Sequence, residues 1–241
     1  MPTGLTPQAG CEWYASRYGW SLRAGNVMVE GTSDVSYFEH CSHLYQARHG
    51  RRLLGTDLSI FAAGHGDDGG TYGVSEKFPT LFNLASLDLD AGGRRRFRTI
   101  ALLDNDRMGQ KAVAGITQGH RQIREYESIF SLKRVMPHKA GSIQKLSERT
   151  RTANASFASL ECTIEDLLSD AFCETFARTT PLAVARPATS SGGAHHRYWT
   201  EQGKRELRLL ALRTARLEDM QPMVEVLRAL RTYVGLSPDG C

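Results

Sequence analysis

The chain has 241 residues, enough for one large domain or for one domain with an appendage. It is 41% hydrophobic and 23% charged, the composition of an ordinary soluble globular protein, and no apolar run approaches the length that spans a membrane. The net charge is +4 and the pI is about 8.9, which permits a polyanionic partner without requiring one.

An N-terminal segment, residues 1–25, precedes the first predicted strand. Aromatic residues recur in it at roughly helical spacing, which predicts a short helix packed on the edge of the domain. These aromatic residues are Trp13, Tyr14, Tyr18 and Trp20. Core packing is their expected role, and stacking on nucleic-acid bases is the alternative.

The first predicted strand, residues 26–29, ends abruptly in acid. Its short apolar run is typical of a parallel strand that is buried on both faces. Glu30 follows the strand directly, and Asp34 stands where the next helix, residues 34–49, is expected to begin. The simplest role of Asp34 is to cap that helix.

A second strand, residues 58–62, leads into a glycine-rich stretch, residues 63–70. No Gly-Lys-Ser/Thr follows, so this stretch is not a Walker loop. Its glycines allow close backbone approach to a phosphate or a metal, and a flexible turn is the alternative. A helix over residues 72–87 is expected to cross back over the sheet.

The third predicted strand, residues 99–103, ends in a second acidic motif, Asp104-Asn105-Asp106. Chemistry in open parallel sheets collects beyond the carboxyl ends of the strands, so Glu30, Asp104 and Asp106 are predicted to meet at one edge. Clustered carboxylates repel one another and are tolerated when a hard cation such as Mg²⁺, or Mn²⁺, lies between them. The alternative is that Asp-Asn-Asp is only a turn.

Taken in this order, the two acidic motifs resemble the signature of the Toprim family. The motifs are Val-Glu-Gly-Thr-Ser-Asp at residues 29–34 and Leu-Asp-Asn-Asp-Arg-Met-Gly at residues 103–109. Toprim is the catalytic domain shared by topoisomerases, bacterial primases, small RNA-maturing nucleases and OLD-type nucleases. The Glu-Gly-x-x-Asp form is most similar to OLD-type and standalone Toprim proteins. The resemblance implies an α/β domain, with a mostly parallel sheet flanked by helices, that binds Mg²⁺ and acts on phosphodiester bonds.

Beyond the second motif, a helix over residues 107–125 and a strand over residues 131–136 are predicted. Residues 138–158 are polar and are expected to form a mobile segment or a short helix. Thr163 then precedes an acidic turn, which is a capping signal, and Glu165 is an acid at the start of a helix.

The stretch around Glu165 also resembles an Ile-Glu-Asn/Asp-Leu element of OLD-like Toprim proteins, in which the glutamate helps to hold a second metal. The resemblance therefore makes Glu165, together with Asp34, a candidate for an outer or second-metal ligand. Helix capping is the alternative role for both residues.

The C-terminal part is predicted to be a loop over residues 185–193 followed by a helical stretch over residues 203–234, broken near Pro222. Lys204 begins this stretch. Phosphodiester cleavage builds negative charge that acids cannot stabilise, so Lys204 is a catalytic candidate, as a basic residue late in the Toprim region of OLD-like nucleases also implies. The alternative is a solvated surface lysine.

Basic residues close to the acidic motifs in the sequence are candidates for contacts with nucleic-acid phosphates. They are Arg95, Arg96, Arg107 and Lys133. The cysteines are five in number, show no metal-ligand spacing and follow no secretory signal, which favours reduced thiols in a cytoplasmic protein.

We therefore expect an N-terminal edge segment (1–25), a Toprim core (26–175) and a C-terminal loop and helical segment packed on the core (176–241). The expected function is a metal-dependent endonuclease that cleaves DNA, with RNA as the second candidate substrate. OLD-type nucleases carry an ABC-type ATPase in the same chain, and this chain has no Walker motif. The resemblance thus suggests an anti-phage defence effector that works with a separate ATPase.

The alternative function is a non-catalytic or masked regulatory Toprim subunit that binds nucleic acid or a partner ATPase. The chain leaves little room for the tyrosine domain and strand-passage gate of a topoisomerase, and it shows no zinc module of a primase. Self-association into a homo-oligomer stays open.

Overall fold

The computed structural model describes residues 10–64, 69–139 and 141–240. Its centre is a four-stranded sheet in the order β2-β1-β3-β4, all of whose neighbouring strands run parallel, and a two-stranded antiparallel hairpin lies apart from it. The predicted fold class is confirmed: an α/β protein with a parallel sheet flanked by helices and a helical C-terminal segment.

Over residues 25–153, strands and helices alternate along the chain. The sheet strands are β1 (Gly25–Val29), β2 (Leu58–Ala62), β3 (Arg98–Leu103) and β4 (Ile129–Ser131), and the hairpin strands are β5 (Val184–Ser191) and β6 (Ala194–Trp199). The α-helices are α1 (Gly10–Arg17), α2 (Thr32–His49), α3 (Gly70–Leu87), α4 (Arg107–Gly119), α5 (Ile143–Ala153), α6 (Asp170–Thr179), α7 (Glu201–Thr214) and α8 (Gln221–Tyr233). Short 3₁₀ turns are η2 (Ala155–Phe157), η3 (Ile164–Leu167), η4 (Pro181–Ala183) and η5 (Leu217–Met220).

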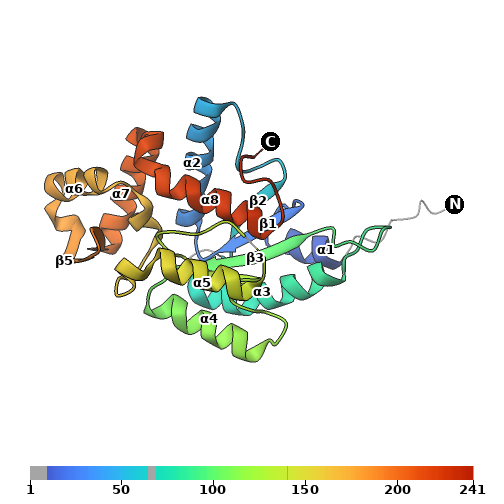
Figure 1. Ribbon diagram of the computed structural model, residues 1–241. Helices are drawn as coiled ribbons and strands as arrows, with labels where there is room; N and C mark the ends of the chain where they lie inside the picture. The colour runs from blue at the N-terminus through green and yellow to red at the C-terminus, as the bar shows by residue number, and fades with distance from the viewer. Residues whose placement is uncertain (1–9, 65–68, 140, 241) are drawn as a thin grey trace.

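Strand β1 shows why the sheet is covered on both faces. Val27 and Val29 belong to one apolar layer, which includes residues of α2 and α8, whereas Met28 belongs to the other, with α1, α3 and α4. Side chains alternate along a strand, so an uninterrupted apolar run needs apolar cover on both sides. Figure 1 shows α2 and α8 on one face and α3 and α4 on the other.

The C-terminal helices belong to the same core as the sheet. The predicted break near Pro222 is confirmed, since α8 begins at Gln221 with proline in its first turn, where a missing N–H costs nothing. Arg231 of α8 is fully buried and donates to both carboxylate oxygens of Asp57, at 2.8 and 2.6 Å, and to the Leu53 carbonyl. This paired charge fastens α8 to the loop before β2.

Two elements after Asp106 differ from the sequence prediction. Helix α4 ends at Gly119 instead of residue 125, and β4 spans Ile129–Ser131 instead of residues 131–136. The backbone of Val135 leaves the sheet because the Asn154 side chain satisfies it: Oδ1 accepts the Val135 N–H at 3.1 Å and Nδ2 donates to its carbonyl at 2.8 Å. A side-chain amide there replaces a strand neighbour.

The predicted loop over residues 185–193 is wrong, because most of it is strand β5 of the hairpin. Gly192 and Gly193 form the turn with φ of 58° and 80°, a left-handed pair that matches strand twist in a two-residue hairpin loop. The polar stretch over residues 138–158 was predicted to be a mobile segment or a short helix. The structure has the short helix α5 there, with Ser142 as its N-cap.

Two further predictions are partly outside the described residues. Of the glycine-rich stretch 63–70, residues 65–68 are not described. Among the residues that are described, no helix combines the length and the apolar character needed to cross a membrane.

Candidate acidic site at the carboxyl edge of the sheet

The carboxyl ends of β1 and β3 deliver the two predicted acidic motifs to one place. The strands are parallel neighbours in register, with Met28 opposite Ala101. Glu30 Oε1 accepts the backbone N–H of Asp104 at 2.9 Å, so the two motifs are joined directly. The acids before α2 and α4 were predicted to share one edge, and the structure brings them together there.

Burial and neighbouring negative charges raise the pKa of three carboxylates at this edge. Burial is the largest cause that raises the pKa of Glu30 to about 7, and the charge of Asp106 adds to it. Burial, then the charges of Glu165 and Glu30, raise the pKa of Asp34 to about 7. The pKa of Asp104 is held well above its ordinary value by burial and by Asp34, Glu165 and Glu30. Such mutual effects require like charges that lie close together.

Lys204 supplies a cation to these acids. Burial alone would lower the pKa of Lys204, but Glu165, Glu201 and Asp104, with Asp106, outweigh it and raise the pKa. One turn further along α7, Arg208 Nη1 donates to Ser33 Oγ at 3.1 Å, which holds this face of the helix against the start of α2.

Gly203, directly before Lys204, lies at a close contact between α7 and η4. Gly203 is buried inside α7, and a Cβ there would lie 2.4 Å from the Ala183 carbonyl oxygen. Because Gly203 has no side chain, α7 packs closely on η4. This packing fixes the position of Lys204 at the acidic edge.

Asp34 and Asp106 each have one oxygen engaged in helix capping. Asp34 Oδ2 accepts the Gly31 N–H at 3.0 Å, and Asp106 Oδ1 accepts the Gly109 N–H at 2.7 Å. A Cβ on Gly109 would lie 1.9 Å from the Asp104 carbonyl oxygen, so only glycine lets α4 begin so close to the strand end. The capping alternative thus holds for Asp34, and Asp106 also caps a helix, although its predicted alternative was only a turn. Each of these two acids keeps one carboxylate oxygen beyond its cap. The cap of η3 is formed by Thr163 and Asp166 and not by Glu165.

Glu165 reaches the site through a backbone bridge. The Asn105 N–H donates to the Cys162 carbonyl at 2.8 Å, and the Cys162 N–H returns a bond to the Asn105 carbonyl at 3.3 Å. This short antiparallel pairing holds the segment before η3 next to the carboxyl end of β3. Glu165 is buried, and its Oε2 has no hydrogen-bond partner. A buried carboxylate oxygen without a partner is costly and points to a missing ligand.

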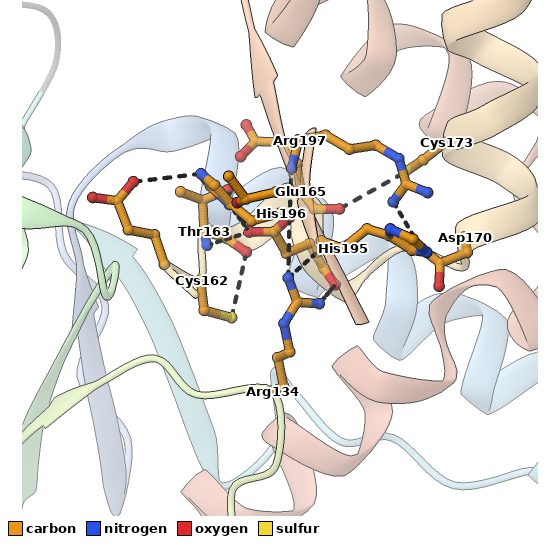
Figure 2. Close-up of polar contacts among 12 residues, drawn as sticks. Arg134, Cys162, Thr163, Glu165, Asp170, Cys173, His195, His196 and Arg197 are labelled. Carbon is orange, nitrogen blue, oxygen red and sulfur yellow. Dashed lines mark hydrogen bonds and ion pairs between the residues drawn. The ribbon is translucent and has the colours of Figure 1, made fainter. Parts of the chain in front are cut away.

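A polar network that the sequence analysis did not foresee holds the Glu165 segment. Asp166 Oδ2 lies 2.6 Å from His196 Nδ1 and accepts the Thr163 N–H at 2.9 Å, while Arg134 lies 3.5 Å from Oδ1. Figure 2 shows the side chains of Arg134, Thr163 and His196 pointing toward one another. The Gly-Gly turn flanked by strand-forming residues was the sequence signal for the hairpin that delivers His196.

Replacing Asp166 by alanine is expected to destabilise the fold by about 3 kcal/mol, because a buried histidine and a partly buried guanidinium lose their carboxylate. Chemical denaturation of the variant and the wild type measures the change. Asp170→Ala is the matched control, since Asp170 is half exposed where it pairs with Arg197 and its loss costs about 0–1 kcal/mol. Equal stability of the two variants would contradict the role of Asp166.

The four predicted phosphate contacts fall in different places. Lys133 donates to Asn105 Oδ1 at 2.8 Å, and Arg107 is exposed in the first turn of α4, so both lie beside the acidic motif. Arg95 and Arg96 precede β3 and so lie at its amino end, opposite the acids. Arg96 forms ion pairs there with Glu12 and Asp88. Sequence proximity to Asp104 was misleading because a strand separates the two ends.

The oxygen atoms available at this edge are of the kind that a hard cation such as Mg²⁺ prefers as ligands. They are carboxylate oxygens, and one of them, Glu165 Oε2, is buried without a partner. Within the described ranges, however, no three Asp, Glu, His or Cys side chains form a ready-made metal-binding group. A bound Mg²⁺ would be held by carboxylates from among the five predicted ligands, Glu30, Asp34, Asp104, Asp106 and Glu165, after side-chain adjustment.

The variant Asp104→Asn is expected to be more stable than the wild type in EDTA at pH 8, by about 2–4 °C in Tm, the shift that roughly 1 kcal/mol gives in a domain of this size. The folded-state pKa of Glu30 and Asp34 is about 7, above the roughly 4 of an unfolded chain. Protonation of Glu30 and Asp34 therefore contributes fully to the stability of the folded state below about pH 4. This contribution is lost as the pH rises through 7, above which both carboxylates are charged and repel their neighbours.

Thermal melts between pH 5 and pH 8, in EDTA and in Mg²⁺, check this. The gap between variant and wild type should narrow toward pH 5, and Mg²⁺ should raise the Tm of the wild type more than that of the variant. Glu148→Gln on the exposed surface of α5 is the control. A wild type more stable than Asp104→Asn in EDTA at pH 8 would count against mutual repulsion.

Comparison with protein-family models, curated proteins and solved structures found no match to the chain. The resemblance to the Toprim family therefore rests on sequence motifs, the two acidic motifs and the stretch around Glu165.

Proposed function

We propose that this protein is a Mg²⁺-dependent nuclease of the Toprim type that cleaves phosphodiester bonds in DNA, with RNA as the second candidate substrate. One observation carries the proposal. At the carboxyl edge of a parallel sheet, carboxylates lie close enough to interact electrostatically, and Lys204 lies beside them. These carboxylates are Glu30, Asp34, Asp104 and Glu165. Stability alone gives no reason to keep buried carboxylates that repel one another, whereas a catalytic site does.

The residues divide the work between binding and charge. A Mg²⁺ held by the carboxylates would polarise the scissile phosphate and orient water. Lys204 interacts with these acids, and its ammonium group would oppose the negative charge that builds on the phosphate during cleavage. Glu30 fixes the backbone of Asp104 through its 2.9 Å hydrogen bond, so the two motifs keep their relative position.

A cleavage panel tests the proposal. Supercoiled plasmid, linear duplex DNA, single-stranded DNA and RNA are incubated with wild type and with Asp104→Ala, purified side by side, in Mg²⁺, Mn²⁺ or EDTA. Cleavage by the wild type alone, abolished by EDTA, is the expected result. Cleavage of none of the substrates, or equal cleavage by the variant, would overturn the proposal.

The second candidate is a non-catalytic regulatory subunit that binds nucleic acid or a partner. The absence of a ready-made metal-binding group among the described residues favours it. Mg²⁺ titration by calorimetry separates the candidates, since a regulatory subunit would show no binding that depends on Asp104. A cytoplasmic role in anti-phage defence beside a separate ABC-type ATPase is part of the proposal and rests on the OLD-type resemblance.

A further inference from the structure

A cavity of about 230 Å³ opens immediately beside the acidic edge. Asn105, which stands between Asp104 and Asp106, lines it, and so does Cys162, its partner in the backbone bridge. The other walls come from the segments before and after β4, from α5, and from η2 and the residues after it. The cavity is therefore directly adjacent to the acidic edge, with Asn105 between the two.

The walls of the cavity combine cations with aromatic side chains. Lys133, Arg134 and Arg151 line it, as do Tyr126 and Phe157, and its lining includes no Asp or Glu. Lys133 uses one N–H on Asn105 Oδ1 and keeps donors for a ligand. A cavity of this kind suits an aromatic ring attached to a negatively charged group.

Tyr126 is held in an unusual backbone conformation at this wall. Its φ is 63°, a left-handed value that no other non-glycine residue adopts in the part of the chain described. A bulky side chain pays a conformational cost there, and such conformations cluster at functional sites. The Tyr126 N–H donates to the Ile129 carbonyl at 3.1 Å, so the turn into β4 imposes the conformation.

We propose that this cavity binds one unstacked base of single-stranded nucleic acid, with Tyr126 and Phe157 contacting the base and Lys133 and Arg151 contacting the adjoining phosphates. The inference rests on the proposed function, for which it names the form of the substrate. Pockets that take whole drug-sized ligands have about 300–1,000 Å³, so the smaller volume here suits a single base. Aromatic contact with a base tolerates any sequence, because every base has a π-face.

Fluorescence anisotropy with a labelled single-stranded DNA of about 12 nucleotides, in EDTA, tests the inference. Phe157→Ala is expected to weaken binding roughly tenfold, the size of one lost base-stacking contact. Arg151→Ala, at an exposed position of α5, is expected to weaken it severalfold and to reduce its salt dependence. A duplex of the same length should bind more weakly than the single strand.

Two matched controls lie outside the cavity. Arg149→Ala changes an arginine of the same helix that does not line this cavity, and Trp13→Ala removes an exposed aromatic side chain from α1. Both should bind like the wild type. Wild-type affinity of Phe157→Ala and Arg151→Ala, or tighter binding of the duplex than of the single strand, would overturn the inference.

The binding experiment is independent of cleavage because EDTA removes the metal. If the wild type cleaves DNA but the cavity variants bind normally, the base site is wrong and the nuclease proposal stands. If the variants lose binding but no substrate is cleaved, the base site stands and the nuclease proposal fails.

Discussion

The variant Asp104→Ala is expected to lose cleavage activity by a factor on the order of 10³ or more, because Asp104 would help to hold the Mg²⁺ that polarises the scissile phosphate and stabilises its developing charge. Burial is the largest cause of the raised pKa of Asp104, and the charges of Asp34, Glu165 and Glu30 raise it further. Single-turnover rates on the substrate that the wild type cleaves best measure the loss, and calorimetry measures Mg²⁺ affinity.

Glu148→Ala is the control for Asp104→Ala, since it removes an exposed carboxylate of α5 and should keep the wild-type rate. The far-UV circular dichroism of both variants should match the wild type. If Asp104→Ala bound Mg²⁺ and cleaved as the wild type does, the acidic edge would have no part in metal-dependent cleavage.

The variant Lys204→Met is expected to cleave about 100-fold more slowly with unchanged Mg²⁺ affinity and folding, the loss that follows removal of one group that stabilises transition-state charge. Methionine preserves the length of the apolar stem, and α7 keeps its packing through Gly203 and Arg208. The drop should appear in the single-turnover rate, with little change in substrate affinity.

Arg205→Met is the matched control for Lys204→Met. Arg205 is the next residue of α7, carries the same charge and is exposed, so its replacement should leave the rate within about twofold. Equal rates for Lys204→Met and the wild type would return Lys204 to the role of a surface lysine.

The features predictable from sequence were those encoded by neighbouring residues. The apolar run ending at Val29 predicted a strand buried on both faces, and the acid after it predicted which edge Glu30 would occupy. The order of the four sheet strands and of the helices between them followed from the same alternation. The break near Pro222 followed from the missing N–H of proline.

The features that could not be predicted depend on partners far apart in the chain. The 2.6 Å contact of Asp166 with His196 joins residues thirty positions apart, and neither residue alone indicates it. The early end of β4 depends on the side chain of Asn154, nineteen positions beyond Val135. Arg95 and Arg96 were grouped with Asp104 by sequence distance, although a strand places its two ends on opposite edges of a sheet.

The cation of the acidic edge comes from a part of the chain made late. Asp104 and Lys204 are separated by 100 positions (204 − 104), and ribosomes add about 5–20 residues per second. On the proposed function, the growing chain therefore spends about 5–20 seconds of synthesis with its acids made but without the lysine that opposes phosphate charge.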